Sequence, residues 1–299
     1  MSGASLTARC TFIKDEYYIW IHVTVTGGAG DLRFHGMTKL RIFQVDAFAD
    51  RLFSGNPAAV CMLDKWLSDE LMHSIAAENN LAETAFIVPK NGALQIRWFT
   101  PTVEVDLCGH ATLASAYVMF NCLNHQENEV KFFSPRSGEL RVFRENDILF
   151  LDFPTDRLEP NDDREQIARC IGGKTIELYK GKTDYIAVVP TEEDVRNLVP
   201  DLKEISKLPA RGLIVTSRGE SVDFVSRFFA PQSGVDEDPV TGSAHTSLIP
   251  LWSGKLKKKE MTARQLSLRG GDLRCLDKGD RCWIGGSARL YLTGEINIE

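Results

Sequence analysis

The sequence repeats itself at a nearly constant spacing, and this repeat limits its possible folds more than any other feature. Three short motifs recur in the same order, at offsets of 130, 133 and 133 residues. The pairs are Arg97-Trp98-Phe99-Thr100-Pro101 with Arg227-Phe228-Phe229-Ala230-Pro231, Cys108-Gly109-His110-Ala111 with Thr241-Gly242-Ser243-Ala244, and Gly138-Glu139-Leu140-Arg141 with Gly271-Asp272-Leu273-Arg274. The repeat predicts two equivalent halves, each with a small-residue turn where a helix begins. The two turns are expected to face each other across a cleft.

A chain of 299 residues is long enough for two domains of ordinary size. We predict an N-terminal extension over residues 1–37, whose order the sequence leaves open, a first half over 38–154 and a second half over 155–299. The proline- and aspartate-rich stretch 154–163 is the expected linker. The last strand is a candidate to pack back on the first half.

Each half is expected to curl a sheet around one central helix. The segment 111–123 is apolar on nearly every face, which is typical of a helix that is wholly buried. Its counterpart is 243–252, where Pro250 is expected to kink the helix or end it early. Short strands surround both segments. The predicted fold class is α+β, with two similar β-barrel-like halves.

Composition excludes several classes of protein. The net charge of −6 argues against nucleic-acid binding, and no apolar run is long enough to span a membrane. Seven cysteines without a Cys-x-x-Cys pair favour a reducing, cytoplasmic location and give no structural zinc site. Gly28-Ala29-Gly30 lacks the third glycine of a dinucleotide-binding loop. We therefore expect no metal or cofactor.

The two predicted helix starts are candidate anion sites. Backbone N–H groups in a first helical turn have no internal partners, and the helix dipole adds partial positive charge. Gly109 and Gly242 would let a ligand approach the backbone closely, and Ser243 adds a hydroxyl donor. Together with Thr241 these residues are the expected substrate-binding residues. Both starts therefore favour a substrate carboxylate or a developing oxyanion, although tight packing alone would also explain the glycines.

Cysteines at both helix starts would indicate a racemase that works with two thiols. Here Cys108 occupies one position and Thr241 the other. A threonine hydroxyl is too weakly acidic to exchange protons with a thiol. The symmetric thiol mechanism is therefore broken, and Cys108 is expected to be a packing residue.

Another base is then needed, and Glu83 is the best candidate. It lies between a helix end and the apolar strand 85–88, where a carboxylate is unexpected unless it has a function, although a solvated junction glutamate is the alternative. His110, one residue inside the first helix, could donate a proton or bind the substrate. Asp238, just before the second helix, could orient His110 or bind a substrate amine.

The motifs in order resemble the phenazine-biosynthesis-like (PhzF-like) family over roughly residues 38 to 299, and the animal branch of that family looks most similar. The matching runs are Gly55-Asn56-Pro57-Ala58-Ala59-Val60, Asn80-Leu81-Ala82-Glu83-Thr84-Ala85-Phe86, Arg97-Trp98-Phe99-Thr100-Pro101, Leu107-Cys108-Gly109-His110-Ala111-Thr112 and Glu237-Asp238-Pro239-Val240-Thr241-Gly242-Ser243-Ala244-His245.

This resemblance implies the diaminopimelate-epimerase-like fold and a cofactor-free isomerase, in which one glutamate moves a proton on a small carboxylic acid. It assigns the glutamate to Glu83, the histidine to His110, the aspartate to Asp238 and the serine to Ser243. Ala82 stands where the family has serine. The resemblance also implies a homodimer.

Two other functions remain open from the sequence. A non-catalytic interaction protein could keep the fold, although it would not need Glu83, His110, Asp238 and Ser243 together. A racemase that uses Cys108 alone would be inactivated by thiol alkylation and by Cys108→Ala.

Overall fold

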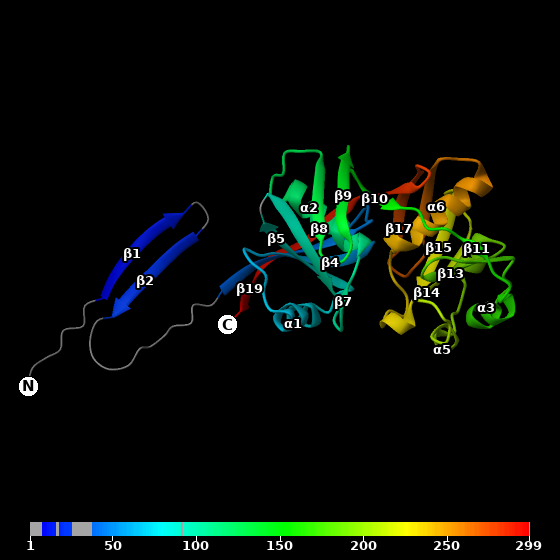
Figure 1. Ribbon diagram of the computed structural model, residues 1–299, viewed down its shortest axis with the longest axis horizontal. Helices are drawn as coiled ribbons and strands as arrows, with labels where there is room; N and C mark the ends of the chain where they lie inside the picture. Colours follow the sequence, from blue (N-terminus) through cyan, green and yellow to red (C-terminus); the bar gives the residue numbers. More distant parts are fainter. Residues whose placement is uncertain (1–7, 16–17, 26–37, 91, 299) are drawn as a thin grey trace, which may run out of the picture. The chain divides into compact units, whose positions relative to one another are not determined.

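The computed structural model describes residues 8–15, 18–25, 38–90 and 92–298. Their contacts divide the chain into two units, and residues 39–297 form the second. In the first unit, strand β1 (Ala8–Asp15) pairs antiparallel with β2 (Tyr18–Val25). Figure 1 labels many of the elements of the two units.

The second unit contains all the motifs that repeat. Its first segment comprises β3 (Thr38–Ala47), β4 (Asn56–Met62), α1 (Asp69–Asn79), β5 (Glu83–Lys90), β6 (Ala93–Phe99), β7 (Glu104–Val105), α2 (Gly109–Asn121), β8 (Glu129–Ser134), β9 (Gly138–Glu145) and β10 (Ile148–Pro154). Its second segment comprises β11 (Glu159–Pro160), α3 (Arg164–Ile171), β12 (Glu177–Lys180), β13 (Asp184–Val188), α4 (Glu192–Arg196), α5 (Leu202–Ile205), β14 (Gly212–Arg218), β15 (Phe224–Phe229), the 3-10 turn η1 (Pro231–Ser233), α6 (Gly242–Leu256), β16 (Glu260–Gln265), β17 (Gly271–Asp277), β18 (Arg281–Gly286) and β19 (Ala288–Ile298).

The two segments pair their strands in the same pattern. In the first, β3–β4 is antiparallel, β4–β5 parallel, β5–β6 antiparallel, β6–β8 parallel, and β8–β9 and β9–β10 antiparallel. The second repeats this order through β12–β13, β13–β14, β14–β15, β15–β16, β16–β17 and β17–β18. Antiparallel pairing of β10 with β18 joins the segments, and β19 beside β3 closes the ring of strands.

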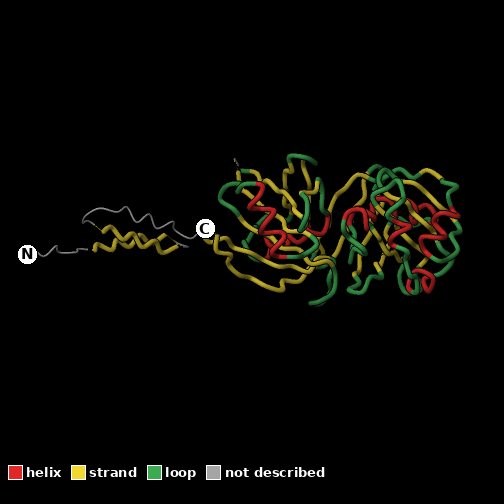
Figure 2. The backbone as a smooth tube through the Cα atoms, turned by 90° about the horizontal axis from the view of Figure 1, so that it is seen from below, coloured by secondary structure: helices red, strands yellow, loops and turns green. Residues whose placement is uncertain are grey.

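Helix α2 lies inside the strands of its segment. It contacts β4, β5, β9 and β10, and nearly all of its side chains are buried, so the prediction of a buried helix near 111–123 is confirmed. Helix α6 contacts β17 and β18 in the same way. Figure 2 shows these helices in red among the yellow strands. Burial on all sides explains why neither helix has a strongly amphipathic sequence.

The second helix does not end at Pro250, because α6 continues to Leu256. Proline removes the N–H that would bond the carbonyl four residues earlier, which is that of Thr246. The backbone N–H of Asp156 donates to this carbonyl at 3.1 Å instead. The Asp156 carboxylate also accepts from the Ser247 hydroxyl at 2.9 Å. The chain after β10 thus supplies the hydrogen-bond donor that the Thr246 carbonyl lacks because of Pro250.

None of the helices in the described part of the chain combines the length and the apolar character needed to cross a bilayer.

Candidate active site

Glu83 is the first residue of β5, where the chain leaves α1. Helix α1 ends with Asn80 in the left-handed conformation, and the Asn79 side chain donates to the Thr84 hydroxyl at 3.0 Å. This turn starts β5 beside β4, with Glu83 opposite Ala58. The Glu83 side chain is 16% exposed, and its Oε2 atom is buried without a hydrogen-bond partner among the described residues.

His110 is the second residue of α2 and faces Glu83. Its Nε2 atom lies 3.1 Å from Glu83 Oε2, although the ring N–H is not aligned with that oxygen as in a hydrogen bond. The other ring nitrogen, Nδ1, is 3.2 Å from Asn56 Nδ2 and 3.5 Å from Cys108 Sγ. The imidazole is therefore enclosed, with one nitrogen directed to the carboxylate.

Asn56 connects His110 to Asp238 of the second segment. Its amide Nδ2 donates to Asp238 Oδ1 at 2.7 Å and to the Val240 carbonyl at 2.9 Å. The preceding residue, Gly55, has a φ of +67°, and a Cβ there would lie 2.1 Å from the Ala47 carbonyl oxygen. The turn that presents Asn56 thus requires glycine.

Thr241 and Gln265 hold Asp238 from the other side. The Thr241 hydroxyl donates to Asp238 Oδ2 at 2.5 Å, and the Thr241 N–H donates to Gln265 Oε1 at 2.9 Å. The Gln265 amide donates to the Asp238 carbonyl at 2.7 Å. Both polar groups of Thr241 therefore already have partners in the protein.

The pKa values of the site reflect burial and close charges. Burial disfavours the imidazolium of His110, but the Glu83 carboxylate beside it favours that form and raises its pKa above the usual value. Burial raises the pKa of Asp238, partly offset by His110. Burial and Glu83 together raise the pKa of the Cys108 thiol to about 11. At neutral pH the thiol is protonated.

The starts of α2 and α6 meet at their glycines. A Cβ on Gly109 would lie 3.4 Å from the Gly242 Cα atom, and one on Gly242 would lie 3.5 Å from the Gly109 Cα atom. Neither helix has a side-chain cap at its N-terminus. The first turn of α2, which carries His110, thus lies beside the first turn of α6, which carries Ser243.

Ser243 contacts a residue that sequence reasoning missed, Arg211. The guanidinium Nη1 donates to Ser243 Oγ at 3.1 Å, and Nε donates to the buried Asp184 at 2.9 Å. Asn56 and Gln265 were also missed as site residues. Asn56 had a signal in its Gly-Asn-Pro turn, whereas Arg211 and Gln265 follow no recognisable motif.

Glu83, Cys108 and His110 together offer metal ligands. One ligand atom from each lies within 4.8 Å of the others. Sulfur, imidazole nitrogen and carboxylate oxygen form a donor set that Zn²⁺ accepts. The Nδ1 side of the imidazole, however, faces the amide donor of Asn56 rather than an acceptor that would orient a metal-bound histidine. The surroundings therefore suit proton transfer better than a metal.

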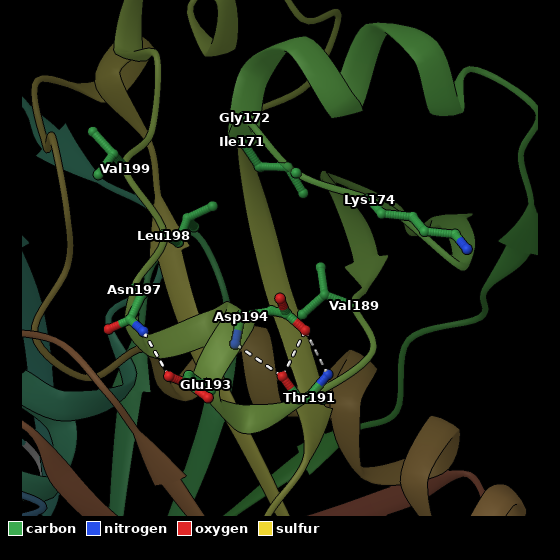
Figure 3. A pocket seen from close by; sticks show the side chains of 11 residues that line it. Ile171, Gly172, Lys174, Val189, Thr191, Glu193, Asp194, Asn197, Leu198 and Val199 are labelled. Atoms are coloured by element: carbon green, nitrogen blue, oxygen red, sulfur yellow. Dashed lines mark hydrogen bonds between the residues drawn. The ribbon is translucent and has the colours of Figure 1, made fainter.

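A pocket of about 450 Å³ lies elsewhere, between the end of α3 and the start of α4 (Figure 3). Thr191 and Asp194 line it and bond to each other as a capping box, with the Asp194 N–H donating to Thr191 Oγ1 at 3.1 Å. None of the predicted site residues lines this pocket. Thr191 and Asp194 serve the helix cap, so we do not assign the function to this pocket.

Comparison with solved structures defines the class of fold. A hydroxyproline epimerase from Agrobacterium vitis aligns with a TM-score of 0.55 at 11% identity, covering 87% of this chain and 93% of that one. A PhzF-family protein from Enterococcus faecalis aligns with a TM-score of 0.85 at 44% identity, covering 87% of this chain and all of that one. The sheet-rich fold is epimerase-like.

The sequence comparisons identify the family. Residues 45–288 match the model of the phenazine biosynthesis-like proteins. An uncharacterized isomerase of Pseudomonas aeruginosa is 50% identical over 260 residues, covering 87% of this chain and all of the relative. The mouse phenazine biosynthesis-like domain-containing protein 1 is 42% identical over 286 residues, covering 86% of this chain and 99% of the relative. The chain belongs to the phenazine biosynthesis-like family.

Proposed function

We propose that the chain is a cofactor-independent isomerase that moves a proton on a small carboxylic acid. The observation that carries this proposal is the contact of Glu83 with His110 at the start of α2, with Nε2 and Oε2 3.1 Å apart. Family membership supports it, since relatives of 50% identity are described as isomerases. Glu83 removes a proton from a carbon beside a carbonyl or unsaturated group and returns it elsewhere on the same molecule.

The other site residues support this transfer in different ways. His110 stabilises the charge that develops on the substrate or protonates it, because its Nε2 atom lies beside the Glu83 carboxylate that moves the proton. Asp238 orients the substrate, while Thr241 holds Asp238 in place. The helix starts at Gly109 and Gly242, with Ser243, hold the substrate carboxylate.

A single base is supported by the strand register. In the first segment Glu83 comes just before Thr84, and Thr84 pairs with Phe99. In the second segment Gly212 comes just before Leu213, and Leu213 pairs with Phe229. Phe99 and Phe229 belong to motifs that repeat, so Gly212 is the counterpart of Glu83. A two-base mechanism would lack its second carboxylate.

We further propose that the two segments, 38–154 and 155–299, arose by duplication, and that the protein acts as a cytoplasmic homodimer.

Deuterium exchange tests the role of Glu83. In D₂O, the protein is expected to exchange a carbon-bound hydrogen of at least one acid in a panel of small carboxylic acids. Glu83→Gln should slow this exchange by roughly 10²- to 10⁴-fold, the usual contribution of a general base. Glu78→Gln, an exposed glutamate on α1, is the matched control and should exchange normally. Undiminished exchange by Glu83→Gln would rule out the assignment.

A further inference from the structure

Arg211 lies next to the position in the second segment that corresponds to Glu83 in the first. It immediately precedes Gly212, the counterpart of Glu83. Its Nη1 atom contacts Ser243, the residue after Gly242, as Glu83 contacts His110, the residue after Gly109. An acid and a histidine at one helix start are thus matched by a cation and a hydroxyl at the other.

The guanidinium of Arg211 is held in one orientation. Asp184, only 3% exposed, accepts from Nε and Nη2 and so uses one edge of the guanidinium. The ring of Phe228 lies 5.1 Å from the guanidinium carbon. A Cβ on Gly212 would lie 2.7 Å from Phe228 Cζ, so the missing side chain is what makes room for this ring. Gly212 stands where a second base would be, and its lack of a side chain also lets Phe228 pack against the Arg211 guanidinium.

This arrangement leaves donors for a ligand. Asp184 and Ser243 account for the partners of Arg211 within the described residues, and the second hydrogen on Nη1 has no protein acceptor there. Ser243 Oγ already accepts from Arg211, so its own hydrogen remains for a ligand. The Arg211 side chain is 35% exposed and open to an incoming group. Beside them, the first turn of α6 has no side-chain cap.

We infer that Arg211 and Ser243 bind the carboxylate of the substrate and make the site specific for acids over neutral analogues. This inference rests on the proposed function and adds the residue that selects the substrate class. Arginine suits the role because its planar fork, charged at all working pH values, recognises carboxylates directionally. It also sets the acid's carboxylate on the α6 side and the reacting carbon towards Glu83.

Binding of simple acids and their amides tests the inference without knowledge of the substrate. Propionate and benzoate, with propionamide and benzamide, are titrated into the full chain, and affinity is measured by calorimetry or by thermal shift. Because Arg211→Met alone would leave Asp184 buried and uncompensated, the informative variant is Arg211→Met with Asp184→Asn. Arg281→Met with Asp152→Asn removes a similar ion pair that contacts neither helix start, and serves as the control.

The wild type is expected to bind at least one acid roughly tenfold or more tightly than its amide, the size expected for hydrogen bonds to charged groups. The Arg211 and Asp184 double variant should lose this preference, Arg211→Lys should keep part of it, and the control pair should keep all of it. No acid preference in the wild type, or an unchanged preference in the double variant, would overturn the inference. Glu83→Gln should keep the preference while losing exchange, so the two proposals fail separately.

Discussion

At the scale of single residues, the site is built from groups whose charge is set by their surroundings. Glu83 keeps an unpartnered buried oxygen, the facing Glu83 carboxylate raises the pKa of His110, and the Cys108 thiol is held neutral. A neutral thiol neither removes a proton nor behaves as a nucleophile. The residue that the two-thiol racemases would use is therefore a packing residue here, as its 6% exposure also suggests.

Cys108→Ala is expected to retain exchange activity within a few-fold of the wild type, because the thiol is protonated at neutral pH and Glu83 supplies the base. The measurement is the same deuterium exchange, accompanied by alkylation with iodoacetamide, which should leave activity intact because the thiol is buried. A collapse of activity in both experiments would support a racemase that uses Cys108 alone.

His245 makes the folded chain sensitive to acid. Burial lowers its pKa to about 4, because Nε2 is enclosed without a partner in the described part of the chain that could accept a second proton. The hydrogen bond from Nδ1–H to the Thr241 carbonyl at 2.8 Å offsets only part of this effect. In the unfolded chain His245 has a pKa of about 6.5, so below this pH it binds a proton there but not in the folded chain. The free energy of unfolding therefore falls as the pH drops from about 6.5 to 4, by about 3 kcal/mol from this residue.

The comparison variant is His245→Asn, whose amide can still donate to the Thr241 carbonyl. Urea unfolding of both proteins at pH 7, 5.5 and 4 should show the wild type losing about 3 kcal/mol more than the variant by pH 4. Asp238 and His110 titrate in both proteins, so the difference isolates His245. Parallel loss of stability in the two proteins would contradict the assignment.

At the scale of elements, the position of each proposed site residue depends on how a strand or helix begins. Glu83 starts β5, His110 lies in the first turn of α2, and Asn56 starts β4 after a glycine turn. The turn is also tied to the second segment, because Arg269 Nε donates to the Gly55 carbonyl and the Gly55 N–H donates to the Gly270 carbonyl. A change in the turn should therefore affect stability and the site together.

Gly55→Ala is expected to reduce the free energy of unfolding by about 2 kcal/mol or more, because both the positive φ and the contact with the Ala47 carbonyl oppose a Cβ. Gly138→Ala is the matched control. Its φ is +74°, but a Cβ there would meet nothing within 4 Å. Chemical denaturation measures both. Equal losses would show that the backbone conformation, rather than the contact, is responsible.

Sequence reasoning located what repeats or follows simple helix rules. Ser68 followed by Asp69 and Glu70 is a favourable start of a helix by sequence alone, and in the structure the Ser68 hydroxyl accepts from the Leu71 N–H. Local sequence makes Glu83 and Asp238 candidates, and the family resemblance adds their proposed roles, because an isolated carboxylate is usually a surface residue. Arg211 and the outcome at Pro250 could not be predicted, since each depends on a partner distant in sequence: Ser243 in one case and Asp156 in the other.

At the scale of the second unit, the two segments are joined by a strand pair. Leu149 of β10 lies opposite Gly286 of β18, and Phe150 opposite Gly285. Trp283 packs edge-on against Phe143 with centroids 4.5 Å apart, and Phe143 stacks on Phe150. Glycine opposite Phe150 is what lets the aromatic ring lie flat across this junction.

Gly285→Ala is expected to destabilise the protein by about 1–3 kcal/mol, because a Cβ there would lie 2.3 Å from Phe150 Cε1 and would force the ring to move. Gly254→Ala, on α6 with nothing within 4 Å of its Cβ, should leave stability unchanged or slightly raised. Thermal unfolding of both variants is the test. A melting temperature for Gly285→Ala equal to that of the wild type would mean that the ring moves freely.

The neighbouring positions of β3 and β19 have a further consequence. Lys39 and Glu295 form an ion pair at 2.7 Å, so the start of one strand lies beside the end of the other. A short peptide could therefore splice these strand ends together, and the backbone could be cut open instead between β10 and β11. Such a circularly permuted chain would carry the second segment first and keep every strand neighbour. The arrangement of the strands therefore does not require the order in which the two segments follow each other along the chain.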